Sequence, residues 1–544
     1  MSLGRTDEYD VDLLADVLVL GGGPAGAWAA VTAAAKGARV VLADKGYCGS
    51  SGAAAASGSG IIYTEPEQRV REEAVNSRYE MGGGLSNREW SMHILEQTYQ
   101  NMHKLHHWGY PFPLEEDFRP YLKSVQGPEY MRLMRKRVKL AGVTILDHSP
   151  ALELLADGEG VAGAEGSRRQ AGGRWRVRAE AVVIATGGCA FLSKALGTNV
   201  LTGDGYLLAA EAGAELSGME FSNAYYISPT FSSVTKGSFY RYATFYYEDG
   251  SIIEGADAMR GKAAIAKALM SQPVYCRLDR TPERLRPLLP WSQSNFFMQF
   301  ERAGIDPFTE RFPITMRFEG TVRGTGGLNL VNSSCATRVP GLYAAGDAAT
   351  RELFCGAVSG GGSHNSAWAM SSGVFAGQGA ADYALKAAGS AARRVLKGLS
   401  STAAASPVTN TVSAQIPALG EDRWGDYTLA VQQEVTPFER NLFRSGEKLR
   451  GSLGRLDRLW QEIRSEAAPS ADLHPQTRQI AAMTATARWM YASALARTES
   501  RGMHRREDCP QTDSAQQRRL LSGGLDKVWV KPEDAASEGG AGCD

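Results

Sequence analysis

The chain has 544 residues, 43% of them hydrophobic and 22% charged, and its 59 basic side chains are balanced by 59 acidic ones. This length is enough for two to four domains with substantial cores. The balanced charge gives no support for nucleic acid or an acidic membrane surface as the main partner. No apolar run reaches membrane-spanning length and no secretory signal pattern occurs, so we expect a cytoplasmic protein with no direct membrane span.

The seven cysteines are scattered and form no CxxC pair. This argues against an iron–sulfur or zinc framework within the chain and favours reduced thiols in a cytosol. The histidines at 103, 106 and 107 fall on a predicted helix, but they would point to different faces, so we predict no metal site.

The first informative stretch is residues 17–26, V-L-V-L-G-G-G-P-A-G, followed by an Ala-rich segment and a second apolar run that ends at Asp44. The pattern predicts a buried parallel strand, a tight turn, a helix and a second strand. Gly21, Gly23 and Gly26 fit the dinucleotide pattern G-x-G-x-x-G: the first forms the turn, the second lets a pyrophosphate approach, and the third allows helix–strand packing. Asp44 would accept hydrogen bonds from ribose hydroxyls. The alternative is a glycine-rich turn that binds nothing.

Residues 48–62 contain almost only small side chains. They form either a flexible linker or a backbone wall that passes close to a flat ring. A later apolar strand, 178–188, ends in A-T-G-G and would turn under the dinucleotide, and residues 324–330 and 339–349 return to the sheet pattern. A Gly/Ser turn then opens an Ala-rich helix at 356–379, whose N-terminus would face an anion.

We predict cofactor contacts where these segments converge. The predicted set is Gly21, Gly23, Pro24, Ala25, Gly26, Asp44, Lys45, Ser51, Gly52, Ala53, Ala185, Thr186, Gly187, Asp204, Gly346, Asp347, Ser363 and Ser366.

The composition also suggests domain boundaries. We expect a first part of the dinucleotide-binding domain at 1–221, a capping domain at 222–320, the second part of the binding domain at 321–385, a linker at 386–420 and a C-terminal helical domain at 421–544.

Together, the glycine turn with Asp44, the small-residue stretch, A-T-G-G at 185–188 and Y-A-A-G-D at 343–347 resemble the flavoprotein-subunit superfamily of fumarate reductase, succinate dehydrogenase, L-aspartate oxidase and adenylylsulfate reductase. Residues 497–508 are similar to the C-terminal signature of that superfamily. The resemblance implies an α/β fold: a Rossmann-like FAD-binding domain with an inserted α+β capping domain and a C-terminal helical domain. In motif the chain is most similar to the adenylylsulfate reductase alpha-subunit branch.

The resemblance also implies FAD, with Asp44 on the adenosine ribose and Asp347 near the ribityl chain. Members that hold flavin covalently carry a His after the second strand, and residues 48–62 contain none. We therefore expect noncovalent FAD.

For catalysis we expect His364 together with either Arg260 or Arg323 to polarise the substrate or exchange its proton; the resemblance points to His364 and Arg260. His364 lies in G-G-G-S-H, where the adenylylsulfate reductase branch carries a His near the flavin; the alternative is a helix-start His bonded to backbone. Arg260 lies in the cap where fumarate reductases carry a proton-delivering Arg; the alternative is a solvated Arg.

Three departures from the superfamily bear on the substrate. Val322 replaces a His, and a Gly/Ser run at 359–362 replaces an Arg, which argues against a C4-dicarboxylate. Ile62 replaces an Asn, which argues against adenylylsulfate. Arg317, Glu319 and Arg323 form either a different anion-recognition set or a structural ion-pair network.

We therefore expect an FAD-dependent oxidoreductase that moves a hydride or two electrons between a small anionic substrate and an external carrier. By resemblance, that carrier is a ferredoxin-like iron–sulfur protein, or oxygen. The alternatives are a noncatalytic FAD electron-relay subunit, or an enzyme for a larger hydrophobic substrate bound against the aromatic run 239–247. The oligomeric state stays open.

Overall fold

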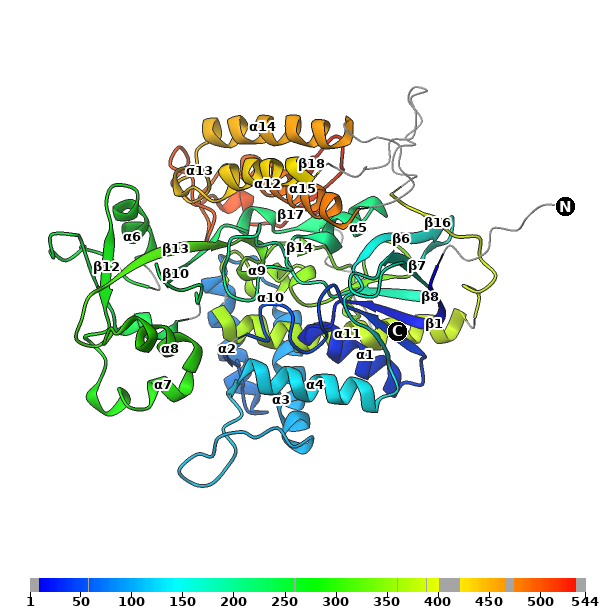
Figure 1. Cartoon of the computed structure of the whole chain (residues 1–544), viewed down its shortest axis with the longest axis horizontal. Helices are drawn as coiled ribbons and strands as arrows, with labels where there is room; N and C mark the ends of the chain where they lie inside the picture. Colours follow the sequence, from blue (N-terminus) through cyan, green and yellow to red (C-terminus); the bar gives the residue numbers. More distant parts are fainter. Residues whose placement is uncertain are drawn as a thin grey trace.

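The structure is a computed structural model. It describes residues 9–534, apart from positions 57, 236, 259–260, 360, 388, 401–420 and 466–473. Figure 1 shows three regions: a mixed sheet with flanking helices, a cap at one side and a layer of helices across the top. In the described part, no helix is both long and apolar enough to cross a membrane.

An eight-stranded sheet forms the centre of the first region. Five strands are parallel, in the order β5, β2, β1, β8 and β15, and β7, β6 and β16 extend the sheet with antiparallel pairing. The strands are β1 (Val11–Leu20), β2 (Val40–Ala43), β5 (Thr144–Leu146), β6 (Ala151–Asp157), β7 (Gly160–Ser167), β8 (Arg174–Ile184), β15 (Leu342–Ala344) and β16 (Lys397–Gly398).

The apolar run before the glycines forms the buried half of β1, because a parallel strand covered on both faces needs apolar side chains on both. Helices α1 (Pro24–Ala35) and α11 (Gly361–Ala387) pack closely beside it. A Cβ on Gly373 would lie 2.4 Å from the Ala25 carbonyl oxygen, and one on Gly377 would lie 2.4 Å from that of Ala29. Alanines on one helix and glycines on the other therefore set this close approach, which brings the start of α11 to the glycine turn.

Further helices and a two-stranded ribbon surround this region, namely α2 (Gln68–Met81), α3 (Arg88–His107), α4 (Gly127–Leu140), α5 (Asp204–Glu211), α9 (Gly320–Arg323), α10 (Glu352–Cys355), β3 (Ser59–Gly60) and β4 (Ser124–Val125). A Gly-rich break at residues 82–84 separates α2 from α3.

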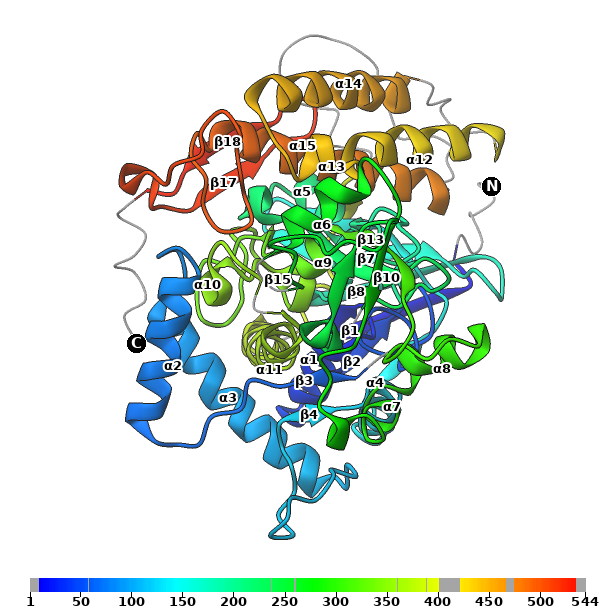
Figure 2. The same ribbon diagram turned by 90° about the vertical axis from the view of Figure 1, so that its left-hand side faces the viewer.

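The cap is a four-stranded antiparallel sheet with helices, green in Figure 1 and facing the viewer in Figure 2. Its elements are β10 (Ala224–Pro229), β13 (Phe312–Glu319), β12 (Val274–Arg277), β11 (Thr244–Tyr246), α6 (Lys262–Leu269), α7 (Leu289–Ser292) and α8 (Ser294–Ala303). Phe296 and Phe300 of α8 pack with Phe239 and Phe312, which gives the cap its own aromatic core.

The C-terminal helices lie across the top of Figure 1: α12 (Glu421–Val435), α13 (Phe438–Asn441), α14 (Gly446–Ser465) and α15 (Pro475–Ala496). The Ala-rich α15 is buried along most of its length, against α5 and α14. After it, Arg497 pairs with Glu220 at 2.8 Å and with Glu499 at 2.9 Å, all of them buried. This network ties the C-terminal signature to the binding domain.

Two segments differ from the expectation. Within 324–330, β14 (Gly327–Leu328) pairs with β9 (Leu216–Ser217) in a separate sheet with β17 (Leu520–Gly523) and β18 (Trp529–Pro532). Within the expected linker, Lys397–Gly398 pairs with β6 as an edge strand, and 401–420 lie outside the described residues. Such two-residue strands carry too short a pattern to show which sheet they join.

Candidate functional site

A cavity of about 1280 Å³ lies where the glycine turn, the start of α11 and the cap meet. It is larger than the roughly 300–1,000 Å³ of most small-molecule sites, so it has room for a dinucleotide and a further ligand. Of the described residues predicted to contact cofactor or substrate, all line this cavity except Gly26. Arg260 lies outside the described residues.

Gly21 and Gly26 have the local geometry that their spacing predicts, and Gly23 stays a predicted pyrophosphate contact. Gly21 has φ of +109°, and a Cβ there would lie 2.3 Å from the Ala185 carbonyl oxygen. A Cβ on Gly26 would lie 1.8 Å from the Gly21 carbonyl oxygen, so this glycine serves helix–strand packing behind the cavity wall. At Gly23, which lines the cavity, a Cβ would meet nothing within 4 Å. The open space lies at the N-terminus of α1, where a pyrophosphate is favoured.

Asp44 follows β2 and is nearly buried. Its carboxylate accepts hydrogen bonds from the Gly22 amide, the Gly46 amide at 2.7 Å and the Ser51 hydroxyl at 2.9 Å. It thus joins the glycine turn to the small-residue stretch and lines the cavity between them.

Lys45 and Asp204 form an ion pair at the cavity. The Lys45 ammonium lies 2.7 Å from the Asp204 carboxylate and 2.7 Å from the Thr202 hydroxyl. The two predicted contacts therefore form one ion pair, which fixes the second strand against the start of α5.

The small-residue stretch lines the cavity at 51–54 and 58–60. The structure thus favours the backbone wall over the flexible linker for these positions.

On the opposite wall, Gly346 and Asp347 follow β15. The Asp347 carboxylate pairs with the buried Arg351, and its carbonyl accepts a hydrogen bond from the Tyr206 hydroxyl at 2.7 Å. Gly346 has φ of +65° and donates its amide to the Ser372 hydroxyl at 2.9 Å. These contacts hold the Gly-Asp turn at the cavity edge.

Arg323 reaches the cavity from the short helix α9 after β13. Its Nε lies 3.4 Å from the Glu319 carboxylate, and both side chains are buried. Burial alone would lower the pKa of the Arg323 guanidinium, but Glu319 and Tyr226 raise it, so the group keeps its positive charge. Arg317 does not join this pair, because its guanidinium donates to the Ser232 carbonyl at 2.9 Å. Arg323 is thus both the cation of the ion pair with Glu319 and the cation that lines the cavity.

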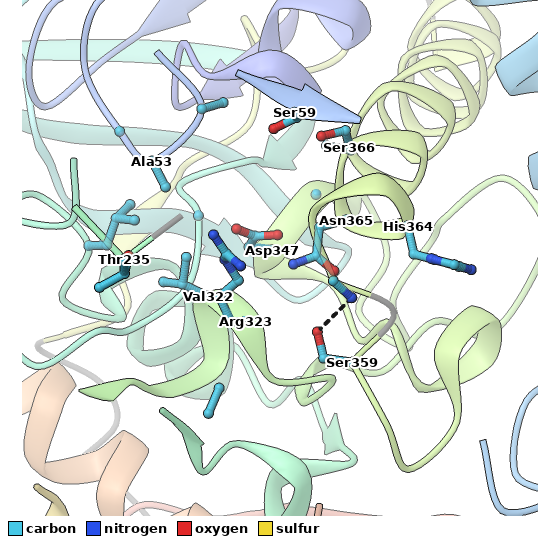
Figure 3. Close-up of a pocket in the computed structure, with 18 of the residues that line it drawn as sticks. Ala53, Ser59, Thr235, Val322, Arg323, Asp347, Ser359, His364, Asn365 and Ser366 are labelled. Atoms are coloured by element: carbon cyan, nitrogen blue, oxygen red, sulfur yellow. Dashed lines mark hydrogen bonds between the residues drawn. The ribbon is translucent and has the colours of Figure 1, made fainter. Parts of the chain in front are cut away.

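His364 lies in the first turn of α11. Its ring centre lies 5.4 Å from that of Phe354, and its Nδ1 lies 3.3 Å from the Ser363 hydroxyl. In Figure 3 the imidazole extends away from Asp347 and Arg323, whereas Asn365 of the same turn extends toward them. The Asn365 amide oxygen is buried with no hydrogen-bond partner, so it is an acceptor available to a ligand donor.

Sequence reasoning missed Asn365, Tyr226 and Lys262, which also line the cavity. Lys262 lies two positions after Arg260 in the same cap segment. Of the three, it is the residue whose place in the site could have been predicted from its neighbours in the sequence. Tyr226 and Asn365 carry no pattern of their own.

The residues present fit FAD. The cavity offers an open glycine backbone at a helix N-terminus, a carboxylate beside it, a backbone wall and an unpartnered amide oxygen. We call the set Gly21–Ala25, Asp44, 51–54, Ala185–Gly187, Gly346–Asp347 and Ser363–Ser366 the FAD cradle.

Two family profiles match the chain: the FAD binding domain at residues 16–230, and the fumarate reductase flavoprotein C-terminal domain at residues 433–531. L-aspartate oxidase of Streptomyces coelicolor is 26% identical over 93% of this chain and 91% of that protein. The fumarate reductase flavoprotein subunit of Mycobacterium tuberculosis is 24% identical over 92% of each chain.

Solved structures share the fold across almost the whole chain. E. coli quinol fumarate reductase superposes with a TM-score of 0.76 at 20% identity, covering 96% of this chain and 97% of that one. Adenylylsulfate reductase of Archaeoglobus fulgidus gives 0.74 at 18% identity, covering 97% and 98%.

The fold, the cavity and the matched profiles define an FAD-dependent oxidoreductase. Within that class, the chain carries the FAD binding domain and the C-terminal domain of fumarate reductase flavoproteins, and its homologues include fumarate reductase flavoprotein subunits and L-aspartate oxidases. Its cofactor is FAD.

Proposed function

We propose that this flavoprotein holds FAD noncovalently and transfers two electrons between a small anionic substrate and an external electron carrier. The observation that carries this proposal is the buried Arg323, which lines the same cavity as the FAD cradle. A buried cation held by one carboxylate and open to a cavity suits a carboxylate, sulfonate or phosphate group.

The substrate would lie between the cradle and the cap. Lys262 lines the cap side, Arg323 lies at the end of α9, and Asn365 and Ser363 line the start of α11. Bound FAD supplies the hydride acceptor or donor. The side chains of this chain would hold the anion, exclude water and exchange the proton. By resemblance, His364 and Arg260 are candidates for polarising the substrate, and in Figure 3 the His364 imidazole faces away from Arg323.

The electron carrier is proposed to be a separate ferredoxin-like iron–sulfur protein, with oxygen as the alternative. The sequence has one dinucleotide pattern and no CxxC pair. Among the described residues, no group of three or more His, Cys, Asp or Glu side chains could hold a metal ion.

A larger hydrophobic substrate is the second candidate, because Phe239 and Tyr240 of the aromatic run line the cavity. Both are nearly buried against Phe296, with ring centres 5.8 and 5.7 Å away, so they serve mainly as cap core.

The test is anaerobic photoreduction of the pure holoprotein, followed by mixing with small carboxylates, sulfonates and phosphate esters, a sterol-like ketone, a ferredoxin and oxygen. We expect at least one anion and the ferredoxin to accelerate flavin reoxidation. Reoxidation by ferredoxin alone would support the relay subunit and contradict the enzyme. Acid precipitation should release all the flavin, and flavin retained in the pellet would contradict noncovalent binding.

A further inference from the structure

Tyr226 lies on β10, the cap strand that borders the cavity, and its side chain lines the cavity. It is flanked by two cations from different elements. The Lys262 ammonium nitrogen lies 3.8 Å from the centre of its ring, and the guanidinium carbon of Arg323 lies 4.4 Å from it. Lys262 begins α6 in the cap, and Arg323 ends α9 beside the FAD cradle.

From these contacts we infer that Tyr226 is the acid–base residue of this site: its phenol gives up and takes back the proton that accompanies hydride transfer between FAD and the substrate. The inference rests on the proposed function. In a substrate oxidation, bound FAD would supply the hydride acceptor, and the Tyr226 phenolate would take the proton from the substrate's O–H, N–H or neighbouring C–H bond and become phenol. In a reduction, the same phenol returns its proton to the substrate.

The surroundings of the phenol support its ionisation. Burial alone would raise the pKa of Tyr226, but the charges of Lys262 and Arg323 and a hydrogen bond from Ser359 outweigh it, so the pKa falls below its ordinary value. Glu319 opposes this, but it is paired with Arg323. Arg317, across from Tyr226 on β13, is bonded to a backbone carbonyl instead.

Other tyrosines of the cavity show why the position is special. Tyr225, next along the strand, donates its hydroxyl to the carbonyls of Val435 and Thr436, and burial holds its pKa well above the ordinary value. Burial likewise raises the pKa of Tyr240. Of these three tyrosines, Tyr226 is the one that faces two cations and whose pKa lies below its ordinary value. A general acid–base group works best when its pKa lies near the working pH.

The first measurement needs no substrate. Tyrosinate absorbance is followed from pH 7 upward in the holoprotein and in Tyr226→Phe, which keeps the ring and loses the hydroxyl. Tyr240→Phe, from the same cavity, is the matched control. In the wild type and in Tyr240→Phe, we expect one tyrosine to ionise at lower pH than the others. That early ionisation should be absent from Tyr226→Phe. Lys262→Met should move that ionisation to higher pH. An early ionisation that persists in Tyr226→Phe, or none in wild type, overturns the inference.

The second measurement uses the anion that reoxidises the photoreduced wild type. Tyr226→Phe should keep its FAD and lose about 10²- to 10⁴-fold in reoxidation rate, the usual contribution of a positioned acid or base. Wild-type rates in Tyr226→Phe would overturn the proton role and leave the proposed function standing. If no anion reacts with the wild type, the proposed function fails, and the proton role fails with it.

Discussion

The Nε of Arg323 lies 3.4 Å from the carboxylate of Glu319, four residues earlier in the chain, and both side chains are buried. A buried pair of this kind contributes little net stability, but removing one partner leaves an uncompensated charge. The pair therefore allows the structural and the functional roles of Arg323 to be separated.

We expect Arg323→Met to destabilise the fold by about 3–5 kcal/mol, because Glu319 is left buried and unpaired. The double variant Arg323→Met/Glu319→Gln should recover most of that loss in chemical denaturation. The control is the exposed pair Arg69 and Glu73, which has the same four-residue spacing. Its double variant Arg69→Met/Glu73→Gln should change stability by no more than about 1 kcal/mol. An equal loss of stability in Arg323→Met and in Arg323→Met/Glu319→Gln would contradict a buried ion pair.

We predict that Gly23 is needed for FAD binding and not for the stability of the fold. A methyl group there meets nothing within 4 Å in the protein, so Gly23→Ala should fold normally but place its Cβ where the pyrophosphate sits. We expect at least about tenfold weaker FAD binding, which is a loss of about 1.4 kcal/mol. Gly158→Ala is the control, since its Cβ also meets nothing within 4 Å and it lies in the turn after β6. FAD titration of the apoprotein checks both, and unchanged affinity in Gly23→Ala would argue against the turn as the pyrophosphate site.

His364 is predicted from the resemblance to act on the substrate. If so, His364→Ala lowers turnover while FAD content and the flavin spectrum stay intact. The ring packs on Phe354, so a structural role predicts instead a lower melting temperature with normal turnover. His364→Phe keeps an aromatic ring against Phe354 and distinguishes the two results. Full activity in both variants would remove His364 from the mechanism.

His504 should make stability depend on pH. Its Nδ1 lies 2.9 Å from an Arg444 nitrogen, which can only donate, so the buried imidazole is neutral and offers its Nε2–H to the Arg497 carbonyl. Burial and Arg444 hold the pKa of His504 well below its ordinary value.

Because the unfolded chain binds a proton below about pH 6.5 and the folded chain does not, His504 lowers the free energy of unfolding as the pH falls. The expected slope is about 1.4 kcal/mol per pH unit for this proton. Denaturation of wild type and His504→Gln between pH 5 and 7.5 measures it. The variant should lose that part of the slope, and identical slopes would contradict a neutral buried His504.

The segments that line the FAD cradle could be predicted from the sequence, because local rules decide their geometry. Gly21 needs a positive φ, Gly26 touches the chain behind it, and Asp44 ends the second strand, all within 24 residues. The cap chemistry depends on contacts across long separations. The cap site combines Tyr226 from a strand, Lys262 from the start of a helix and Arg323 from a short helix. Almost a hundred residues separate the first of them from the last. No periodicity records that these three meet, and only the fold brings them together.

The most direct test measures the rate of flavin reoxidation in a variant of Arg323. The holoprotein is photoreduced without oxygen and mixed in a stopped-flow instrument with the anion that reoxidises wild type fastest. Arg323→Met/Glu319→Gln and the control Arg69→Met/Glu73→Gln are treated in the same way. If FAD exchanges electrons with an anion held by Arg323, the control keeps the wild-type rate and the Arg323 variant loses at least about tenfold, with its FAD still bound. Equal rates in all three proteins would contradict it.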